Sequence, residues 1–181
     1  MTGQWDTREA VRDYVATVFD TEREFAIYET RYGWVCRLVL TEEEAASDMG
    51  MGLGNHVVDR RTGVVTAHTS LHPLTIGEMY DEAVEAGGPT PGYQVYPPTW
   101  DIQVERARET SAEIEYGVRA RSLTTPPAEE PGEYRVIIDK TDNVYRTEPE
   151  TSHVACAYAV QWAEAIGRPS GTWPESASFQ V

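Results

Sequence analysis

The chain has 181 residues, of which 40% are hydrophobic, so it can bury the core of one domain or of two small ones. Its 30 acidic and 15 basic residues give a formal net charge of −15, which argues against binding to nucleic-acid phosphates or to an anionic membrane. No apolar run approaches the ~20 residues of a membrane span, and the N-terminus has no basic segment leading into an apolar one. We therefore expect a cytoplasmic protein.

The first half of the chain combines helical and strand-like patterns. Asp6 and Glu9 have the spacing of a capping box, and Val11, Val15 and Val18 then recur at helical spacing. The elements predicted here are a helix over 8–19, strands over 25–29 and 34–40, a loop over 41–54, a hairpin with strands 55–59 and 64–68, and a helix capped by Thr75 that places Ile76, Met79, Tyr80 and Ala83 on one face and ends at Gly87-Gly88.

The second half begins after a proline-rich connection over 89–98. Residues 99–112 are ambiguous, because Trp100, Ile102 and Val104 alternate like a strand whereas the residues after Gln103 suit a helix. The elements predicted here are a short strand with a helical turn over 100–111, a strand over 114–120, a loop over 124–132, a hairpin with strands 134–139 and 144–147, a helix capped by Ser152 that ends at Gly167, and an irregular tail over 168–181.

One pattern occurs twice. Residues 56–65 read His-Val-Val-Asp-Arg-Arg-Thr-Gly-Val-Val, and residues 136–145 read Val-Ile-Ile-Asp-Lys-Thr-Asp-Asn-Val-Tyr. Each copy is an apolar run, an Asp, a basic residue, a polar turn and an apolar pair, and a helix follows. The predicted fold class is α+β, with antiparallel β-hairpins forming a sheet, helices packed on one face, and two degenerate copies of one unit over 1–88 and 99–181 that either share a sheet or do not.

No arrangement of residues names a reaction. His56, His68 and Asp59 are close in sequence, but His56 and Asp59 point to opposite faces of one strand, which argues against a metal site. His153 and Cys156 lack an orienting third group and an oxyanion hole, and the only other cysteine, Cys36, lies in a predicted strand. We therefore predict buried free cysteines, no catalytic or metal-binding residues and no cofactor. The glycine-rich segment 50–54 has neither Lys nor the strand-then-helix context of a phosphate loop.

The acidic charge favours a contact with a basic protein partner. The predicted partner-binding residues combine one acidic helix face with aromatic side chains of the proline-rich connection; they are Glu78, Asp81, Glu82, Glu85, Tyr93, Tyr96 and Trp100. A solvated helix face is the alternative interpretation of the four carboxylates.

The strand-borne Trp34-Val35, the glycine-rich loop, Val57-Val58-Asp59 and Thr62-Gly63-Val64 together resemble the YrhB-type immunity proteins of bacterial polymorphic toxin systems, whose hairpin is shared by PepSY-like and cystatin-like domains. The resemblance covers about residues 8–88. It implies a small cytosolic α+β protein that binds and blocks a cognate toxin and performs no chemistry. The second half departs from it, since Asn143 stands where Gly63 would repeat.

We therefore predict a non-enzymatic bacterial immunity factor that binds a basic toxin domain. Two alternatives stay open: a structural or regulatory self-associating module such as a homodimer, and a ligand-binding protein or enzyme with a cleft between sheet and helices.

Overall fold

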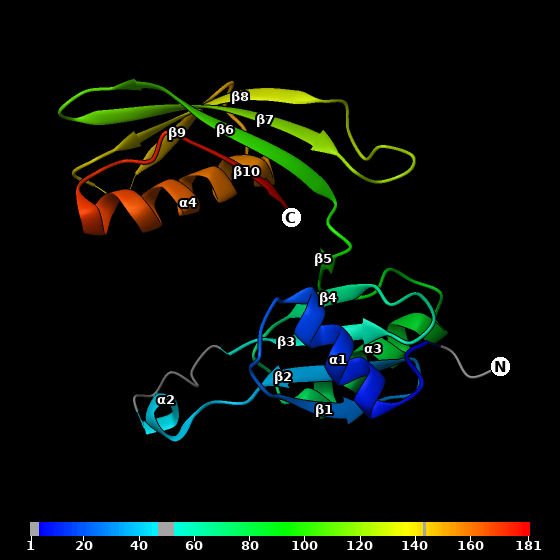
Figure 1. The fold of residues 1–181 in the computed structure, drawn as a ribbon. Helices are drawn as coiled ribbons and strands as arrows, with labels where there is room; N and C mark the ends of the chain where they lie inside the picture. The colour runs from blue at the N-terminus through cyan, green and yellow to red at the C-terminus, as the bar shows by residue number, and fades with distance from the viewer. Residues whose placement is uncertain (1–3, 47–52, 143) are drawn as a thin grey trace. The chain divides into compact units, whose positions relative to one another are not determined.

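The computed structural model describes residues 4–46, 53–142 and 144–181. The chain divides into two compact units, Met1–Pro97 and Pro98–Val181, and the boundary falls in the proline-rich connection. Each unit contains one five-stranded antiparallel sheet, with two long helices packed against it in the first unit and one in the second (Figure 1). The predicted α+β class with antiparallel hairpins is confirmed. Among the described helices, none combines the length and the apolarity that a bilayer crossing needs.

The first unit is a meander with strand order β1-β2-β3-β4-β5. Its elements are α1 (Arg8–Val18), β1 (Phe25–Glu29), β2 (Gly33–Leu38), α2 (Glu42–Ala46), β3 (Asn55–Asp59), β4 (Val65–His68), α3 (Pro73–Glu85) and β5 (Tyr93–Tyr96). The cap of α1 is Thr7, whose Oγ1 accepts the N–H of Ala10 at 3.2 Å, one residue after the predicted Asp6. The predicted strands match β1 to β4 to within two residues, whereas α2 and β5 were not predicted.

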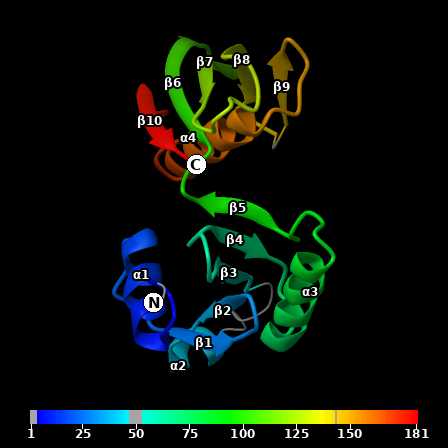
Figure 2. The ribbon, with the colours of Figure 1, turned by 90° about the vertical axis from the view of Figure 1, so that its right-hand side faces the viewer.

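The two long helices of this unit lie on opposite faces of the sheet (Figure 2), not on one face as the sequence suggested. Successive residues of a strand point to opposite faces, so Trp34 and Cys36 of β2 pack in the α1 core while Val35 packs in the α3 core. Both faces of the central strands are therefore buried. The members of the α1 core are Val11, Val15, Phe25, Ile27, Trp34, Cys36, Val58 and Val65, and those of the α3 core are Val35, Val57, Ile76 and Tyr80.

The second unit has strand order β10-β6-β7-β8-β9 and one helix. Its elements are β6 (Trp100–Glu109), β7 (Glu113–Ser122), β8 (Gly132–Asp139), β9 (Tyr145–Glu148), α4 (Val154–Ser170) and β10 (Ser176–Gln180). Helix α4 packs on one face only, with Ala155, Cys156, Ala159 and Ala163 buried against the sheet. The opposite face of the sheet carries mainly charged and polar side chains, although Ile137 on that face is buried.

Two predictions for the second unit were wrong. Residues 100–109 form one continuous strand with no helical turn, because Ile102 and Val104 are buried under α4 and the whole segment pairs with β7. The tail was expected to be irregular, but residues 176–180 form β10 along the other side of β6. The helix ends at Ser170, and Gly171 after it adopts φ +70.

Candidate functional site

Helix α3 presents a mixed apolar and acidic surface to solvent. The helix begins at Pro73, and the cap is His72, whose Nδ1 accepts the N–H of Leu74 at 3.3 Å; the predicted cap Thr75 therefore lies inside the helix. Ile76 and Tyr80 face the sheet as predicted, whereas Met79 is 43% exposed. We call the α3 outer face the set of exposed side chains that consists of Leu74, Glu78, Met79 and Glu82 of the helix and Leu71, which precedes it.

Only two of the four carboxylates predicted on this helix belong to that surface. Asp81 accepts the backbone N–H groups of Arg31 at 2.9 Å and of Tyr32 at 3.0 Å, so it holds the β1–β2 turn against the helix. Glu85 forms an ion pair with the side chain of Arg31. Glu78 and Glu82 are exposed, and no ion pair to either carboxylate occurs among the described residues.

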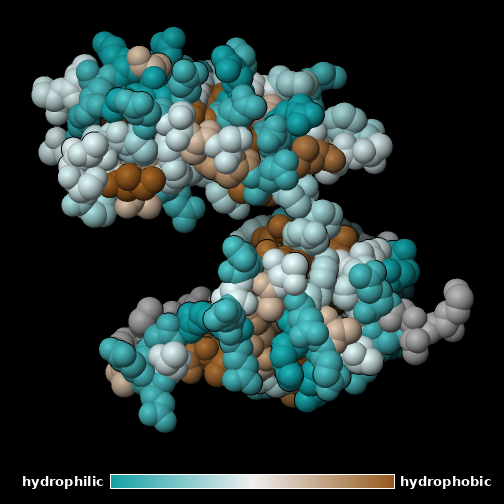
Figure 3. Space-filling view, in the orientation of Figure 1, coloured by the Kyte–Doolittle hydropathy of each residue, from teal (hydrophilic) through white to brown (hydrophobic). Residues whose placement is uncertain are grey.

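The α3 outer face has the composition of an interface core with an acidic rim. The exposed fraction of Leu71 is 48% and that of Leu74 is 54%. Residues three and four positions apart on a helix are neighbours, so Leu74, Glu78 and Glu82 form one line along the surface. Exposed apolar side chains on an element that also carries exposed, unpaired carboxylates are typical of a protein–protein contact. In the space-filling view, hydrophilic residues cover much of the visible surface and smaller hydrophobic patches lie between them (Figure 3).

The three predicted aromatic residues lie in different environments. Tyr93 of β5 is 65% exposed, and it shares a strand face with Val95, which packs in the α1 core, so it points away from the α3 side of the sheet. Tyr96 packs edge-on against Tyr14 of α1, with 5.9 Å between ring centroids. Trp100 belongs to the second unit, where its ring lies 4.6 Å from that of His153. The structure does not gather them with the α3 carboxylates into one surface of the first unit.

A polar network around Asp59, which sequence reasoning did not assign to a role, fixes the β3–β4 turn. One carboxylate oxygen accepts the N–H of Arg61 at 3.0 Å and both the N–H and the hydroxyl of Thr62 at 2.6 and 2.7 Å. The other accepts the hydroxyl of Tyr80 at 2.7 Å, which ties the turn to α3. Burial raises the pKa of Asp59, but the hydrogen bonds from Tyr80, Thr62 and Arg61 outweigh it, so the pKa lies below its ordinary value.

Arg60, next in sequence, joins this turn to the first hairpin. Its guanidinium lies 4.8 Å from the centre of the Trp34 ring, and its Nη2 donates to Glu29 at 2.8 Å and to the carbonyl of Thr30 at 3.2 Å. The Nε1 of Trp34 donates to the carbonyl of Trp5 at 2.8 Å. These contacts show that Trp34 and the turn after Asp59, two features on which the family resemblance was based, have structural roles in the first unit.

A hollow of about 640 Å³ lies beside this turn, and its lining includes three arginines, Arg31, Arg60 and Arg61. Arg31 and Arg60 are neutralised by Glu85 and Glu29. This leaves Arg61 as the one lining arginine without an ion pair among the described residues. The hollow therefore does not concentrate enough free positive charge to favour an anionic ligand.

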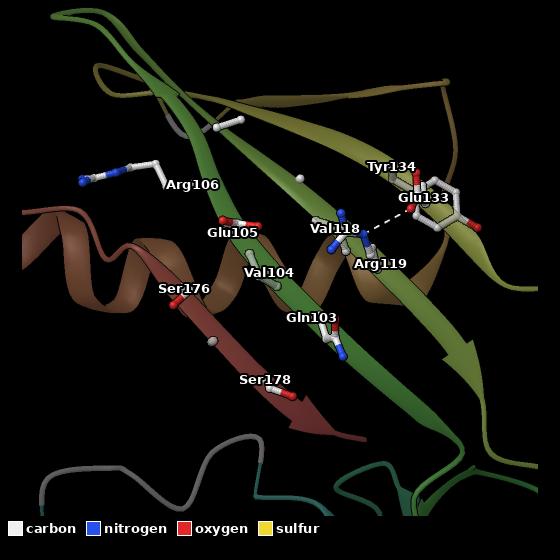
Figure 4. A pocket seen from close by; sticks show the side chains of 13 residues that line it. Gln103, Val104, Glu105, Arg106, Val118, Arg119, Glu133, Tyr134, Ser176 and Ser178 are labelled. Atoms are coloured by element: carbon white, nitrogen blue, oxygen red, sulfur yellow. Dashed lines mark hydrogen bonds and ion pairs between the residues drawn. The ribbon is translucent and has the colours of Figure 1, made fainter.

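The second unit has a larger hollow, of about 710 Å³, over the exposed face of its sheet (Figure 4). It exists because Gly117 has no side chain and because Ser176 and Ser178 of β10 are small. Arg119 and Glu133 form an ion pair at 3.1 Å on one side of it. Every arginine on this sheet face is paired in the same way; the other pairs are Arg108–Glu115, Arg121–Asp101, Arg135–Glu148 and Arg146–Glu113. Both arginines that line the hollow, Arg106 and Arg119, are in ion pairs with carboxylates, so neither is an unpaired cation for an anionic ligand.

The histidines and cysteines serve the fold. His56 packs on Phe19, with 4.5 Å between ring centroids on the α1 side, whereas His68 bonds to Thr66 at 2.8 Å on the α3 side, so they do not converge. Among the described residues, no group of three His, Cys, Asp or Glu could hold a metal ion. Both cysteines are free and buried, as predicted, and burial raises their pKa, that of Cys36 to about 12 and that of Cys156 to about 11.

His153, which was considered beside Cys156, caps α4. Its Nδ1 accepts the N–H of Ala155 at 3.1 Å, and its ring stacks 5.0 Å from that of Tyr134. The predicted cap Ser152 precedes it by one residue. Most of the glycine-rich segment 50–54 lies outside the described residues; Gly54, which is described, approaches the backbone of His68 too closely for a Cβ.

The comparison with known families falls on the unit that carries α3. Residues 6–88 match the immunity protein 35-like domain family. The match confirms the immunity-protein resemblance and coincides with its span in the sequence. It supports a toxin-neutralising role in general terms, with a toxin as the protein partner. No curated protein and no solved structure matches the chain at a significant level.

The first unit, which contains the matched residues 6–88, also carries most of the negative charge. Residues 1–97 contain 16 acidic and 7 basic residues, and residues 98–181 contain 14 and 8. All eight basic side chains of the second unit are in ion pairs with carboxylates, and its excess of six acidic residues is smaller than the excess of nine in the first unit. A partner attracted by charge therefore meets its strongest field at the first unit.

Proposed function

We propose that this protein is a bacterial immunity factor that binds and neutralises a cognate toxin through the α3 outer face, without chemistry of its own. The match of residues 6–88 to the immunity protein 35-like domain carries the general role. The exposed Leu71, Leu74 and Met79 beside the unengaged Glu78 and Glu82 support the choice of surface.

The partner surface that fits α3 is basic at its rim and apolar at its centre. Apolar anchors supply most of the binding energy of a protein interface, while charges at the rim mainly steer association and fix orientation. The net charge of −15 suits a toxin domain with a cationic surface. Two buried free cysteines fit a reducing compartment, so the proposed place of action is the cytoplasm.

The experiment measures the affinity of the purified chain for the purified product of the gene immediately upstream, over a series of salt concentrations. The test variant is Glu78→Arg/Glu82→Arg. The matched control is Glu22→Arg/Glu24→Arg, which reverses two exposed carboxylates of the same unit that lie before β1. Asp81 and Glu85 are left intact because both hold the β1–β2 turn.

We expect the wild-type complex to weaken with salt, the α3 variant to lose roughly tenfold or more in affinity, and the control to lose much less. Leu74→Ala should weaken binding without adding salt dependence, since it removes an apolar contact. Equal losses in both charge variants would refute the α3 outer face but leave toxin binding in place. Absence of any complex with the wild-type chain would contradict the proposed function itself.

A further inference from the structure

The two units share one set of hairpin contacts at a spacing of 80 residues. In the first unit the N–H of Asp59 donates to the carbonyl of Val64, and the Asp59 carboxylate accepts two N–H groups of the turn. In the second unit the N–H of Asp139 donates to the carbonyl of Val144, and its carboxylate again accepts two N–H groups, from the residues two and three positions later.

The basic residue that follows each Asp also makes equivalent contacts in the two units. Arg60 bonds to the carboxylate of Glu29 and to the carbonyl of the threonine that follows it. Lys140 bonds to the carboxylate of Glu109 and, likewise, to the carbonyl of the next threonine. Two hairpins thus agree contact by contact, which aligns β1 to β4 of the first unit with β6 to β9 of the second.

The fifth strand breaks this correspondence. After α3, β5 pairs with β4, so β4 has a neighbouring strand on both sides. After α4, β10 returns to the other edge of its sheet and pairs with β6. Among the described residues, no strand therefore pairs with the outer side of β9, the counterpart of β4.

The free side of β9 offers the backbone groups of two residues. Because Asp139 bonds to Val144 and hydrogen-bonded positions alternate along an antiparallel pair, Arg146 directs its backbone groups toward β8. Tyr145 and Thr147 direct theirs away from the sheet. The side chains beside this edge are exposed as well, with Val144 at 63% and Tyr145 at 45%.

We propose that β9 pairs with β9 of a second copy of this chain, antiparallel and with Arg146 on the two-fold axis. In that register Tyr145 of each copy faces Thr147 of the other, and both pairs can exchange two hydrogen bonds. The facing residues are separated by an even number of positions along the strand, so their side chains lie on the same face of the joined sheet. A register centred on Thr147 instead opposes Tyr145 to Pro149, which has no N–H to donate.

The local charge at this edge permits a second copy despite the net charge of the chain, because the ion pair of Arg146 offsets the repulsion between the two arginines that face each other. Arg146 is paired with Glu113 at 2.7 Å and Glu148 with Arg135 at 3.2 Å, so the outer row of the edge is neutral. The first unit shows that four residues of β5 suffice to cover such an edge. The buried area is small, so we expect a weak dimer whose population rises with protein concentration.

The first test is disulfide trapping with Arg146→Cys. Residues that face each other at a non-hydrogen-bonded antiparallel position have Cα atoms about 4.5 Å apart, within the range for a disulfide. The native cysteines are buried and do not compete. The control Arg119→Cys removes an ion-paired arginine from the middle of the same sheet face. We expect a covalent dimer under mild oxidation for Arg146→Cys only; equal or absent cross-linking of the two variants would overturn the proposal.

The second test measures the mass of the untagged chain by sedimentation equilibrium over a concentration series. Tyr145→Pro deletes one outward N–H without touching the bonds to β8, and Tyr145→Thr keeps that N–H but removes the aromatic ring. We expect association in the wild type and in Tyr145→Thr, and a monomer in Tyr145→Pro. A wild-type chain that stays monomeric throughout, or a folded Tyr145→Pro that still associates, would overturn the proposal. Should Tyr145→Pro not fold, the trapping result decides.

Discussion

The bond between Tyr80 and Asp59 couples helix α3 to the β3–β4 turn, and its removal tests how the first unit is held together. Tyr80 is 3% exposed and donates to the carboxylate at 2.7 Å. Hydrogen bonds to charged groups contribute about 1.5–3 kcal/mol. Because Asp59 keeps its donors from the turn, we expect Tyr80→Phe to lower the free energy of unfolding by about 2 kcal/mol at pH 7.

The loss should depend on pH. The pKa of Asp59 in the folded chain lies below its ordinary value of 3.8. A depressed pKa means that the carboxylate stabilises the fold at pH values above the ordinary one and that this stability disappears as pH falls through the folded pKa. The difference between the wild type and Tyr80→Phe should therefore be constant from pH 7 down to about pH 5 and shrink below about pH 4.

The assay is urea unfolding followed by tryptophan fluorescence at several pH values at which the chain stays folded. Tyr28→Phe is the matched control, since Tyr28 packs against the same α3 core and no partner of its hydroxyl is found among the described residues. A loss at pH 7 no greater than that of the control would refute the coupling. A loss that persisted unchanged below pH 4 would show that packing, not the carboxylate, is responsible.

Two further predictions concern glycines and cysteines. Gly63→Ala should lower the free energy of unfolding by about 1–2 kcal/mol or more, because Gly63 has φ +72 and a Cβ there would lie 2.3 Å from the Trp5 ring. The control is Gly117→Ala, where a Cβ would have no neighbour closer than 3.8 Å. In the same urea assay, this control should leave the free energy of unfolding unchanged or slightly raised. Cys36 and Cys156 should both resist a thiol reagent at pH 8 in the native chain and both react in urea, as counted by absorbance; rapid native labelling of either would contradict their burial.

Local chemistry was sufficient to predict the hairpins and the three long helices. An apolar run ended by Asp, a basic residue and a polar turn specifies its own geometry, because the Asp carboxylate bonds to N–H groups only two and three residues away. Helical periodicity likewise predicted α1, α3 and α4 with errors of a few residues at their ends. The chemistry of the caps was less certain, since both His72 and His153 cap their helices through Nδ1 in place of the expected hydroxyls.

The acidic helix illustrates what a sequence leaves undecided about a site. All four carboxylates of α3 lie on one element, as predicted, but spacing does not reveal which of them meets a backbone amide from a distant turn. Asp81 does, across 50 residues to Arg31. Glu78 and Glu82 do not, and only for that reason are they available to a partner. The exposure of Met79 on the same helix also depends on how α3 lies on β2.

By itself, the sequence determined the α+β class, the antiparallel hairpins, the acidic charge and the resemblance to immunity proteins, because each of these depends on composition or on residues close along the chain. The tertiary structure alone decided that residues 100–109 form one strand, that α1 and α3 cover opposite faces, and that the fifth strands close different edges. These features depend on pairing between residues far apart in the chain. The free energy of such pairing comes from buried contacts that no local pattern encodes.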